Sequence, residues 1–243
     1  ALDEITNNLQ RIRELAVQSA NATNSDSDRQ ALDDEVQQRI GEIDRIASQT
    51  AFNGLKVLDG TFGEKGFQVG ANAGETISVD LTESTRANSI GGVVSAGLSV
   101  DLSSKALGND SSLAIVTAEG GSQTVSFDGT EDSLEKIAEK INSSIDGAYA
   151  VINKAGDDIR IASKGEITSV TYTAGTNSGT AGGIFTDVSA PVTADQGSLN
   201  DSTVETVGAA NEMILRIDNA LDSVNSTRGQ LGAIQNRFES TIA

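Results

Sequence analysis

Three groups of adjacent carboxylates are the residues best able to bind a metal ion or to act as an acid and a base: Asp33-Asp34-Glu35, Glu131-Asp132 and Asp157-Asp158. Oxygen ligands suit divalent cations, and two carboxylates can share the acid and base roles of glycoside hydrolysis. None of the three groups has the spacing of an EF-hand loop. Neighbouring carboxylates on a helix usually face water or lie in its first turn, where the helix dipole favours them. We therefore predict no metal site, no cofactor and no catalytic residue.

The composition excludes most other kinds of chemistry. The chain has no His and no Cys, so it cannot form a Ser-His-Asp triad, a Cys-His pair or a zinc site built from these ligands. Its glycines do not form a nucleotide-binding loop. The 17 basic and 35 acidic residues give a net charge of −18, which repels nucleic acid and anionic lipid. No apolar run approaches the roughly 20 residues that span a bilayer, so we predict neither an enzyme nor a nucleic-acid or membrane partner.

The first helix carries the most informative polar face. Its apolar positions follow steps of three and four and fall at Leu2, Ile5, Leu9, Ile12 and Ala16. Gln10, Arg11 and Gln18 lie on the polar side, and Leu15 lies outside the narrow stripe. Two interpretations stay open, and the spacing favours the first. Either Leu15 widens the core stripe and Arg11 is solvated, or Arg11 and an exposed Leu15 form a hot spot for a partner protein.

Helices are predicted at both ends of the chain, at about 1–21, 27–49 and 203–242. Ser27 with Gln30 and Ser202 with Glu205 have the spacing of capping boxes that open the second and third helices. The short polar connection makes the first two helices antiparallel neighbours. At a rise of 1.5 Å per residue the last helix spans roughly 60 Å and the first two only about 30 Å. We therefore expect the last helix to be partly bare, or to be covered by an earlier part of a first helix that already starts mid-pattern at Ala1.

The rest of the chain has strand signals. Between 52 and 81 the apolar period changes to two, with glycine turns, which predicts hairpins. Residues 91–202 are rich in Ser, Thr, Gly and Asp and predict a β-rich domain with a helix at 131–144 that Thr130 caps. Its strands are expected at 112–118, 123–127, 148–153, 159–162 and 168–173. The predicted fold class is α+β: an antiparallel, coiled-coil-like helical bundle with a β-hairpin region, and an inserted β-rich domain containing one helix.

Four motifs resemble bacterial flagellin, the subunit of the flagellar filament. They are QRIRELAVQSAN from Gln10, EIDRIASQTAFNGLKVLDG from Glu42, FQVGANAGETI from Phe67 and LGAIQNRFESTI from Leu231. The resemblance covers about residues 1–90 and 203–243. It implies an inner helical domain formed by those two ranges and a variable outer domain at 91–202. It also implies a fragment that lacks both terminal polymerisation helices.

The resemblance further implies an extracellular, secreted protein of the bacterial flagellum that serves motility. Its implied partners are other flagellin subunits, the innate immune receptor Toll-like receptor 5 and, for the full-length chain, flagellar export and cap proteins. The receptor-binding residues implied by motif alignment are Gln10, Arg11, Leu15, Gln18 and Glu35. Replacing Arg11 or Leu15 with alanine is then expected to weaken receptor binding without unfolding the bundle.

Two other functions remain as alternatives. A hook-filament junction protein shares helical termini with flagellin, although the FNGLKVLDG and FQVGAN motifs favour flagellin. A surface adhesin would bind glycans through the middle domain, but Tyr149 and Tyr172 are its only tyrosines, which argues against stacking platforms for sugars. Some flagellins carry a zinc peptidase in this region, which the absence of His excludes here. Loops such as Thr176 to Thr180 could carry O-linked sugars.

Overall fold

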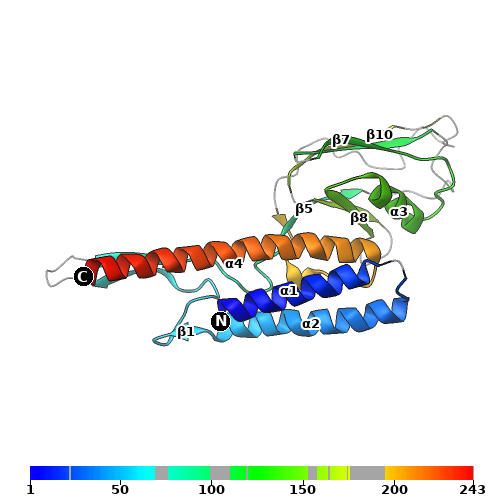
Figure 1. Cartoon of the computed structure of the whole chain (residues 1–243). Coiled ribbons are helices and arrows are strands. Elements are labelled where there is room, and N and C mark those ends of the chain that lie inside the picture. Colours follow the sequence, from blue (N-terminus) through cyan, green and yellow to red (C-terminus); the bar gives the residue numbers. More distant parts are fainter. Residues whose placement is uncertain are drawn as a thin grey trace.

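The computed structural model describes residues 1–21, 23–68, 76–98, 110–118, 120–152, 158–163, 165–173, 175 and 195–242. Three long helices lie side by side: α1 (Leu2–Ser19), α2 (Asp26–Gln49) and α4 (Val207–Ile242). The β-rich middle of the chain lies beside the N-terminal end of α4, and the C-terminus lies at the far end of that helix (Figure 1). The fold is therefore a mixture of helices and small antiparallel sheets. None of the described helices has the length and apolar content needed to cross a membrane.

Apolar side chains of the three long helices form one core, as the spacing in the sequence predicts. From α1 it includes Ile5, Leu9, Ile12, Leu15 and Ala16, each with 0% of its surface exposed. Leu15 is therefore part of the core, and the interpretation that leaves it exposed is wrong. The stripe on α1 is wide because α2 and α4 cover this helix from two sides, so more than a narrow row of positions is buried.

The helices begin at different caps from those predicted. Ser25, not Ser27, caps α2, because its extended backbone lets its hydroxyl accept from the Asp28 amide while the Asp28 carboxylate accepts from the Ser25 amide. Thr206, not Ser202, caps α4 by accepting from the Ala209 amide. Ser202 instead donates its hydroxyl to the Leu199 carbonyl. In each case a side-chain oxygen two to four residues from the predicted position accepts from the free amides.

A hairpin covers the C-terminal part of α4. Strands β3 (Gly63–Gln68) and β4 (Thr76–Leu81) pair in antiparallel register. Their buried face packs against Leu231, Ile234 and Phe238 of α4, and the rings of Phe67 and Phe238 meet edge to face at 5.7 Å. The hairpin covers only one side of this part of α4, and none of residues 228–240 is fully buried, so the expectation of a partly bare helix is confirmed. Cover by an earlier part of the first helix stays a prediction. The short strands β1 (Ala51–Phe52) and β2 (Leu55–Lys56) form a second hairpin.

The middle of the chain forms two antiparallel sheets and the helix α3 (Leu134–Ser144), which Ser133 caps in place of the predicted Thr130. One sheet has the order β10-β6-β7 and the other β11-β5-β9-β8. The strands are β5 (Val93–Leu98), β6 (Ser112–Thr117), β7 (Gly121–Ser126), β8 (Ala148–Ile152), β9 (Ile159–Ser163), β10 (Ile167–Thr173) and β11 (Asp195–Gln196). The short 3-10 helix η1 (Leu199–Asp201) leads towards α4. Their apolar side chains share a second core, separate from that of the long helices.

Five of these strands match predicted ones within a few residues, whereas β5 and β11 were not predicted. The sequence of β5 has two adjacent valines and a glycine, so it lacks alternation. Strand β11 has only two residues and pairs with β5, which no local pattern reveals. The predicted strand end at 153, the carboxylate Asp157 and the loop at 176–180 lie outside the described residues.

The side-chain amide of Asn142 forms hydrogen bonds with the free edge of strand β8. The Asn142 Nδ2 atom donates to the Ala150 carbonyl at 2.9 Å, and the Ala150 amide donates to Asn142 Oδ1 at 2.7 Å. The asparagine thus takes the two hydrogen bonds that a further strand would otherwise form. A side chain on α3 in this way fixes the helix against the sheet.

Replacing Asn142 with leucine is expected to lower the free energy of unfolding by about 1–3 kcal/mol, because the amide and carbonyl of the buried Ala150 lose their partners. Chemical denaturation followed by circular dichroism measures the change. Ser144→Ala is the control, because this exposed serine lies on the same helix. An equal effect of the two substitutions would show that the amide does not stabilise the edge.

Candidate functional site

The site implied by the resemblance lies where α1 faces α2. Arg11 of α1 donates from Nε to Glu35 Oε1 of α2 at 3.0 Å, and from Nη2 to Glu35 Oε2 at 3.5 Å. Its Nη1 donates to Glu14 Oε2 at 3.0 Å. Arg39 Nη2 lies 3.7 Å from the same Glu35 oxygen. The structure therefore brings two predicted site residues, Arg11 and Glu35, into one ion-pair network.

The antiparallel packing of α1 and α2 explains this pairing. Arg39 also donates to Asn8 Oδ1. From the Arg11–Glu35 pair to the Asn8–Arg39 pair, the chain moves three residues back on α1 and four residues forward on α2. The signal was present in the sequence, since two antiparallel helices with a short connection pair residues at similar distances from the turn. We predicted the two residues for one site but not that they touch each other.

The network is open to solvent. The Arg11 side chain is 43% exposed and that of Glu35 36%. The hydrogen bond to Glu35, followed by that to Glu14, raises the pKa of the Arg11 guanidinium above its ordinary value. The guanidinium therefore keeps its charge, and the two carboxylates fix its planar fork in place. An exposed ion pair of this kind adds little stability, about 0–1 kcal/mol, so its geometry matters more for recognition than for folding.

Of the other predicted residues on α1, two are exposed and one is buried. Gln10 and Gln18 are exposed on α1, whereas Leu15 lies beneath them in the core. Val17, which was not predicted for the site, is 51% exposed on the same helix. Its position outside the apolar stripe was the signal. The outer face of α1 thus offers amides, an ordered arginine and one apolar side chain.

Ion pairs on the opposite flank fix α1 against α4. Arg13 Nε lies 3.1 Å from Asp218 Oδ1, and Arg228 Nη2 lies 2.7 Å from Asp3 Oδ1. Ten residues along α1 therefore correspond to ten residues back along α4, which is the register of two antiparallel helices. This register holds the outer face of α1 in one orientation between its two neighbours (Figure 1).

The acidic groups have structural roles in the part of the chain that the structure describes. Asp33 is buried and accepts from the Val204 amide and the Thr203 hydroxyl, both at 2.8 Å, which ties α2 to the segment before α4. Asp132 pairs with Lys136 at 2.7 Å, and Glu131 accepts from the Asp128 amide. No group of carboxylates among the described residues has the geometry of a metal site.

Comparison with known proteins gives a family for the region that contains the site. Residues 1–63 match the bacterial flagellin N-terminal helical region. The match includes all of α1 and α2, and so every predicted site residue.

Relatives named as flagellins align with the whole chain. Flagellin D of Vibrio cholerae is 35% identical over 248 residues, which cover 100% of this chain and 64% of the relative. Flagellin D of Vibrio anguillarum is 36% identical with the same coverage. The chain thus spans 64% of the length of these relatives. Among solved structures, that of FliC from Burkholderia pseudomallei is 29% identical with a TM-score of 0.56, covering 97% of this chain and 95% of that one.

Proposed function

We propose that this chain is part of a structural subunit of the bacterial flagellar filament, an extracellular protein that serves motility and is not an enzyme. The match of residues 1–63 to the flagellin N-terminal helical region carries the proposal. Alignment of the whole chain with Vibrio flagellins supports it, as does the similarity to the FliC structure. The composition also supports a structural role, because without His or Cys most hydrolytic sites cannot be built.

In this proposal residues 1–90 and 203–243 form the inner domain and 91–202 the variable outer domain. The two separate hydrophobic cores support this division, except that Leu199 packs in the core of the long helices. Other copies of the subunit are the main partners, and export and cap proteins act on the full-length chain. Since the relatives are longer than this chain, the proposal also includes terminal helices beyond it that drive polymerisation.

Expression of the full-length protein in a strain that lacks its own filament protein tests this function. Filaments visible by electron microscopy, together with restored swimming, are the expected result. A hook-filament junction protein would leave the cells without filaments, because it occupies only the junction. That outcome would refute the proposal in favour of the alternative.

We further propose that Toll-like receptor 5 binds the outer face of α1 and the adjoining edge of α2. Gln10, Arg11, Gln18 and Glu35 would contact the receptor directly. The exposure of these side chains and the ordered fork of Arg11 support this, because an arginine held in place loses less entropy on binding. Stacking of subunits in the filament would cover the same face.

Leu15 has a different role in this proposal. Its side chain is fully buried, so it supports the receptor-binding face from beneath by packing α1 against its neighbours. Replacing it with alanine is expected to cost about 2–5 kcal/mol of stability through the cavity left behind. Weaker signalling by Leu15→Ala would therefore not separate binding from folding, contrary to the expectation from the sequence.

Arg11→Ala is the informative substitution. It is expected to reduce receptor activation by about 30-fold or more, since truncation of a hot-spot arginine costs about 2 kcal/mol or more. A cell reporter assay for the receptor measures the half-maximal concentration. Arg45→Ala is the matched control, because Arg45 is 53% exposed and its side-chain partners among the described residues, Glu42 and Gln49, both lie on α2. Equal activity of the two variants and the parent would refute the assigned site.

A further inference from the structure

The hairpin of β1 and β2 presents two large apolar side chains to solvent. Phe52 pairs across the strands with Leu55, and their surfaces are 63% and 46% exposed. Asn53 and Gly54 form the turn between them, with φ of 49° and 80°. Both central residues therefore have a left-handed conformation, as in a type I′ turn, whose twist matches the twist of the two strands. The two side chains are therefore held on a defined turn.

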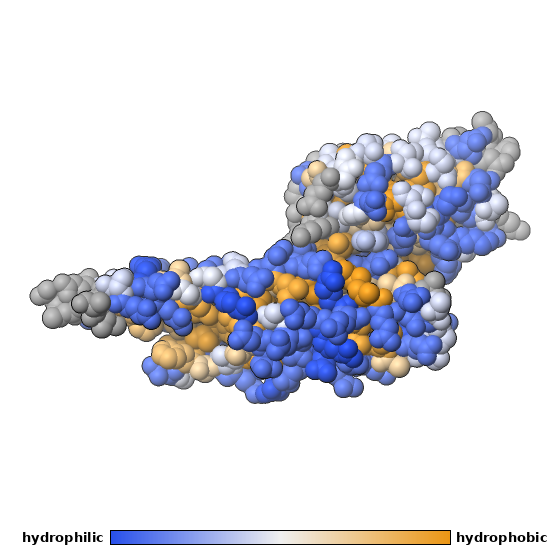
Figure 2. Space-filling view, in the orientation of Figure 1, coloured by the Kyte–Doolittle hydropathy of each residue, from blue (hydrophilic) through white to orange (hydrophobic). Residues whose placement is uncertain are grey.

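Their exposure stands out against the rest of the described chain. Only four large hydrophobic side chains there are exposed, and two of them form this one cross-strand pair. Apolar colour marks the projecting hairpin in Figure 2, at the lower left where Figure 1 labels β1. An apolar pair that is displayed in this way gains free energy when another surface covers it.

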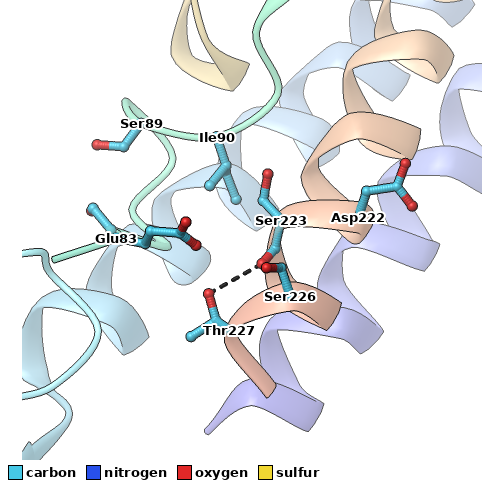
Figure 3. Close-up of a pocket in the computed structure, with 8 residues that line it drawn as sticks. Glu83, Ser89, Ile90, Asp222, Ser223, Ser226 and Thr227 are labelled. Atoms are coloured by element: carbon cyan, nitrogen blue, oxygen red, sulfur yellow. Dashed lines mark hydrogen bonds between the residues drawn. The ribbon is translucent and has the colours of Figure 1, made fainter. Parts of the chain in front are cut away.

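A groove elsewhere on the helical part has properties that complement the hairpin. It has a volume of about 500 Å³ and lies between the segment before β5 and the middle of α4. Its lining residues are Glu83, Ser84, Ser89, Ile90, Asp222, Ser223, Ser226 and Thr227. In Figure 3 the side chains of Glu83 and Ile90 point towards the turn of α4 that carries Ser226. Ile90 is only 2% exposed, so the surface of the groove is mainly polar, and Glu83 adds a carboxylate to it.

The charges of the two surfaces are opposite. Lys56 lies at the base of the hairpin, where its ammonium donates to the Gln49 carbonyl at 3.2 Å and keeps further donors for a partner. Glu83 is exposed, and no ion pair within the described part of the chain involves it. In a chain with a net charge of −18, a lysine beside an exposed apolar pair is well suited to an acidic groove.

We propose that the β1–β2 hairpin of one subunit docks into this groove of a second copy of the chain, with Phe52 and Leu55 inserted in the groove and Lys56 beside Glu83. No hairpin residue lines the groove of its own chain, so the two surfaces are different. A contact between two different surfaces is head to tail and extends to an open assembly unless its rotation closes a ring. This inference rests on the proposed function, because it assigns one of the contacts between filament subunits.

Cross-linking of engineered cysteines in assembled filaments tests the contact. The chain has no cysteine of its own, so each introduced thiol is unique. Ala51→Cys places one on the hairpin, and Ser226→Cys places one on the rim of the groove. Both positions are exposed, and neither change removes a side chain that the proposal uses. A short bis-maleimide reagent should convert filaments of the double variant into a ladder of covalent oligomers.

The control combines Ser226→Cys with Gln38→Cys, which places the other thiol at an exposed position on α2. Filaments that give no more ladder than this control would overturn the docking contact and leave the filament function intact. Failure of the unmodified full-length protein to assemble at all would overturn the filament function and the contact with it. The two failures are therefore distinguishable.

Exchange of the two charges provides a second test. Lys56→Glu or Glu83→Lys alone is expected to slow filament growth about tenfold, because like charges then face each other during association. The double variant should recover to within about threefold of the parent, because the attraction is restored with opposite polarity. Growth measured by light scattering from seeds gives these rates. Equal slowing of the double variant and the single variants would overturn the Lys56–Glu83 pairing.

Discussion

Glu212→Gln is expected to lower the free energy of unfolding by about 3–5 kcal/mol, because it removes the carboxylate that Arg160 and Arg216 share at a buried junction. Glu212 lies on α4 and is 3% exposed, and Arg216, one turn further on, is 0% exposed. Glu212 Oε1 accepts from Arg216 Nε at 2.9 Å and Nη2 at 2.6 Å. Its Oε2 accepts from Arg160 Nη2 of β9 at 2.6 Å.

The effect is large because Arg216 cannot leave the interior. Its Nη1 donates to the Gly91 carbonyl at 2.9 Å, where the chain passes from the long helices to the middle sheets. A buried guanidinium that loses the carboxylate paired with two of its nitrogen atoms keeps more of its desolvation cost. The amide of glutamine supplies one acceptor oxygen without charge, so it cannot replace both contacts of the carboxylate.

Denaturation by guanidinium chloride, followed by circular dichroism, measures this change. Glu205→Gln is the matched control, because Glu205 is exposed just before α4, and it should change stability by less than about 0.5 kcal/mol. Glu212→Leu combined with Arg216→Met should recover most of the loss, because apolar residues of similar size can replace a buried ion pair. A loss of less than about 1 kcal/mol for Glu212→Gln would contradict the proposed role of the ion pair.

The helices at both ends and most middle strands could be predicted because local patterns determine them. The stripe of Ile5, Leu9 and Ile12 has a helical period, and the packing that buries it has the same period. Caps are less predictable, since several hydroxyls lie within reach of the same free amides. Ser25 and Ser27 are both candidates for α2, and the extended backbone at Ser25 decides between them.

What the sequence could not give depends on contacts between distant segments. The position of Leu15 is ambiguous from the spacing of α1 alone, and the core that α1 shares with α2 and α4 buries it. The pairing of Glu212 with Arg160 depends on the register between elements that are far apart in the sequence. The cover over the end of α4 comes from a hairpin whose buried face is visible in the sequence but whose partner is not. Resemblance supplied the candidate site residues, and packing separated the exposed ones from the buried one.

Gly91→Ala is expected to cost about 2–4 kcal/mol, because two independent penalties apply at one position. The φ angle of Gly91 is +78°, a conformation that residues with a Cβ atom rarely adopt. A Cβ atom there would lie 2.8 Å from Leu199 Cδ2 and 3.0 Å from the Arg216 carbonyl oxygen. Leu199 is fully buried and its amide donates to the Ile90 carbonyl, so it cannot retreat without loss of core packing.

Two other glycines separate these penalties. Gly63 has a φ of +65° and nothing within 4 Å of a Cβ, so Gly63→Ala should show the backbone penalty alone, about 1–2 kcal/mol. Gly229 lies inside α4 with open space around it and no positive φ, so Gly229→Ala should stabilise the protein by about 0.5–1 kcal/mol. Denaturation of the three variants under the same conditions gives the comparison. If Gly91→Ala costs no more than Gly63→Ala, the close approach of η1 and α4 at Gly91 is not a tight contact. If Gly91→Ala costs more than Gly63→Ala, the absence of a side chain at Gly91 is what allows the backbone to pass close to α4. At this point Arg216 donates to the Gly91 carbonyl.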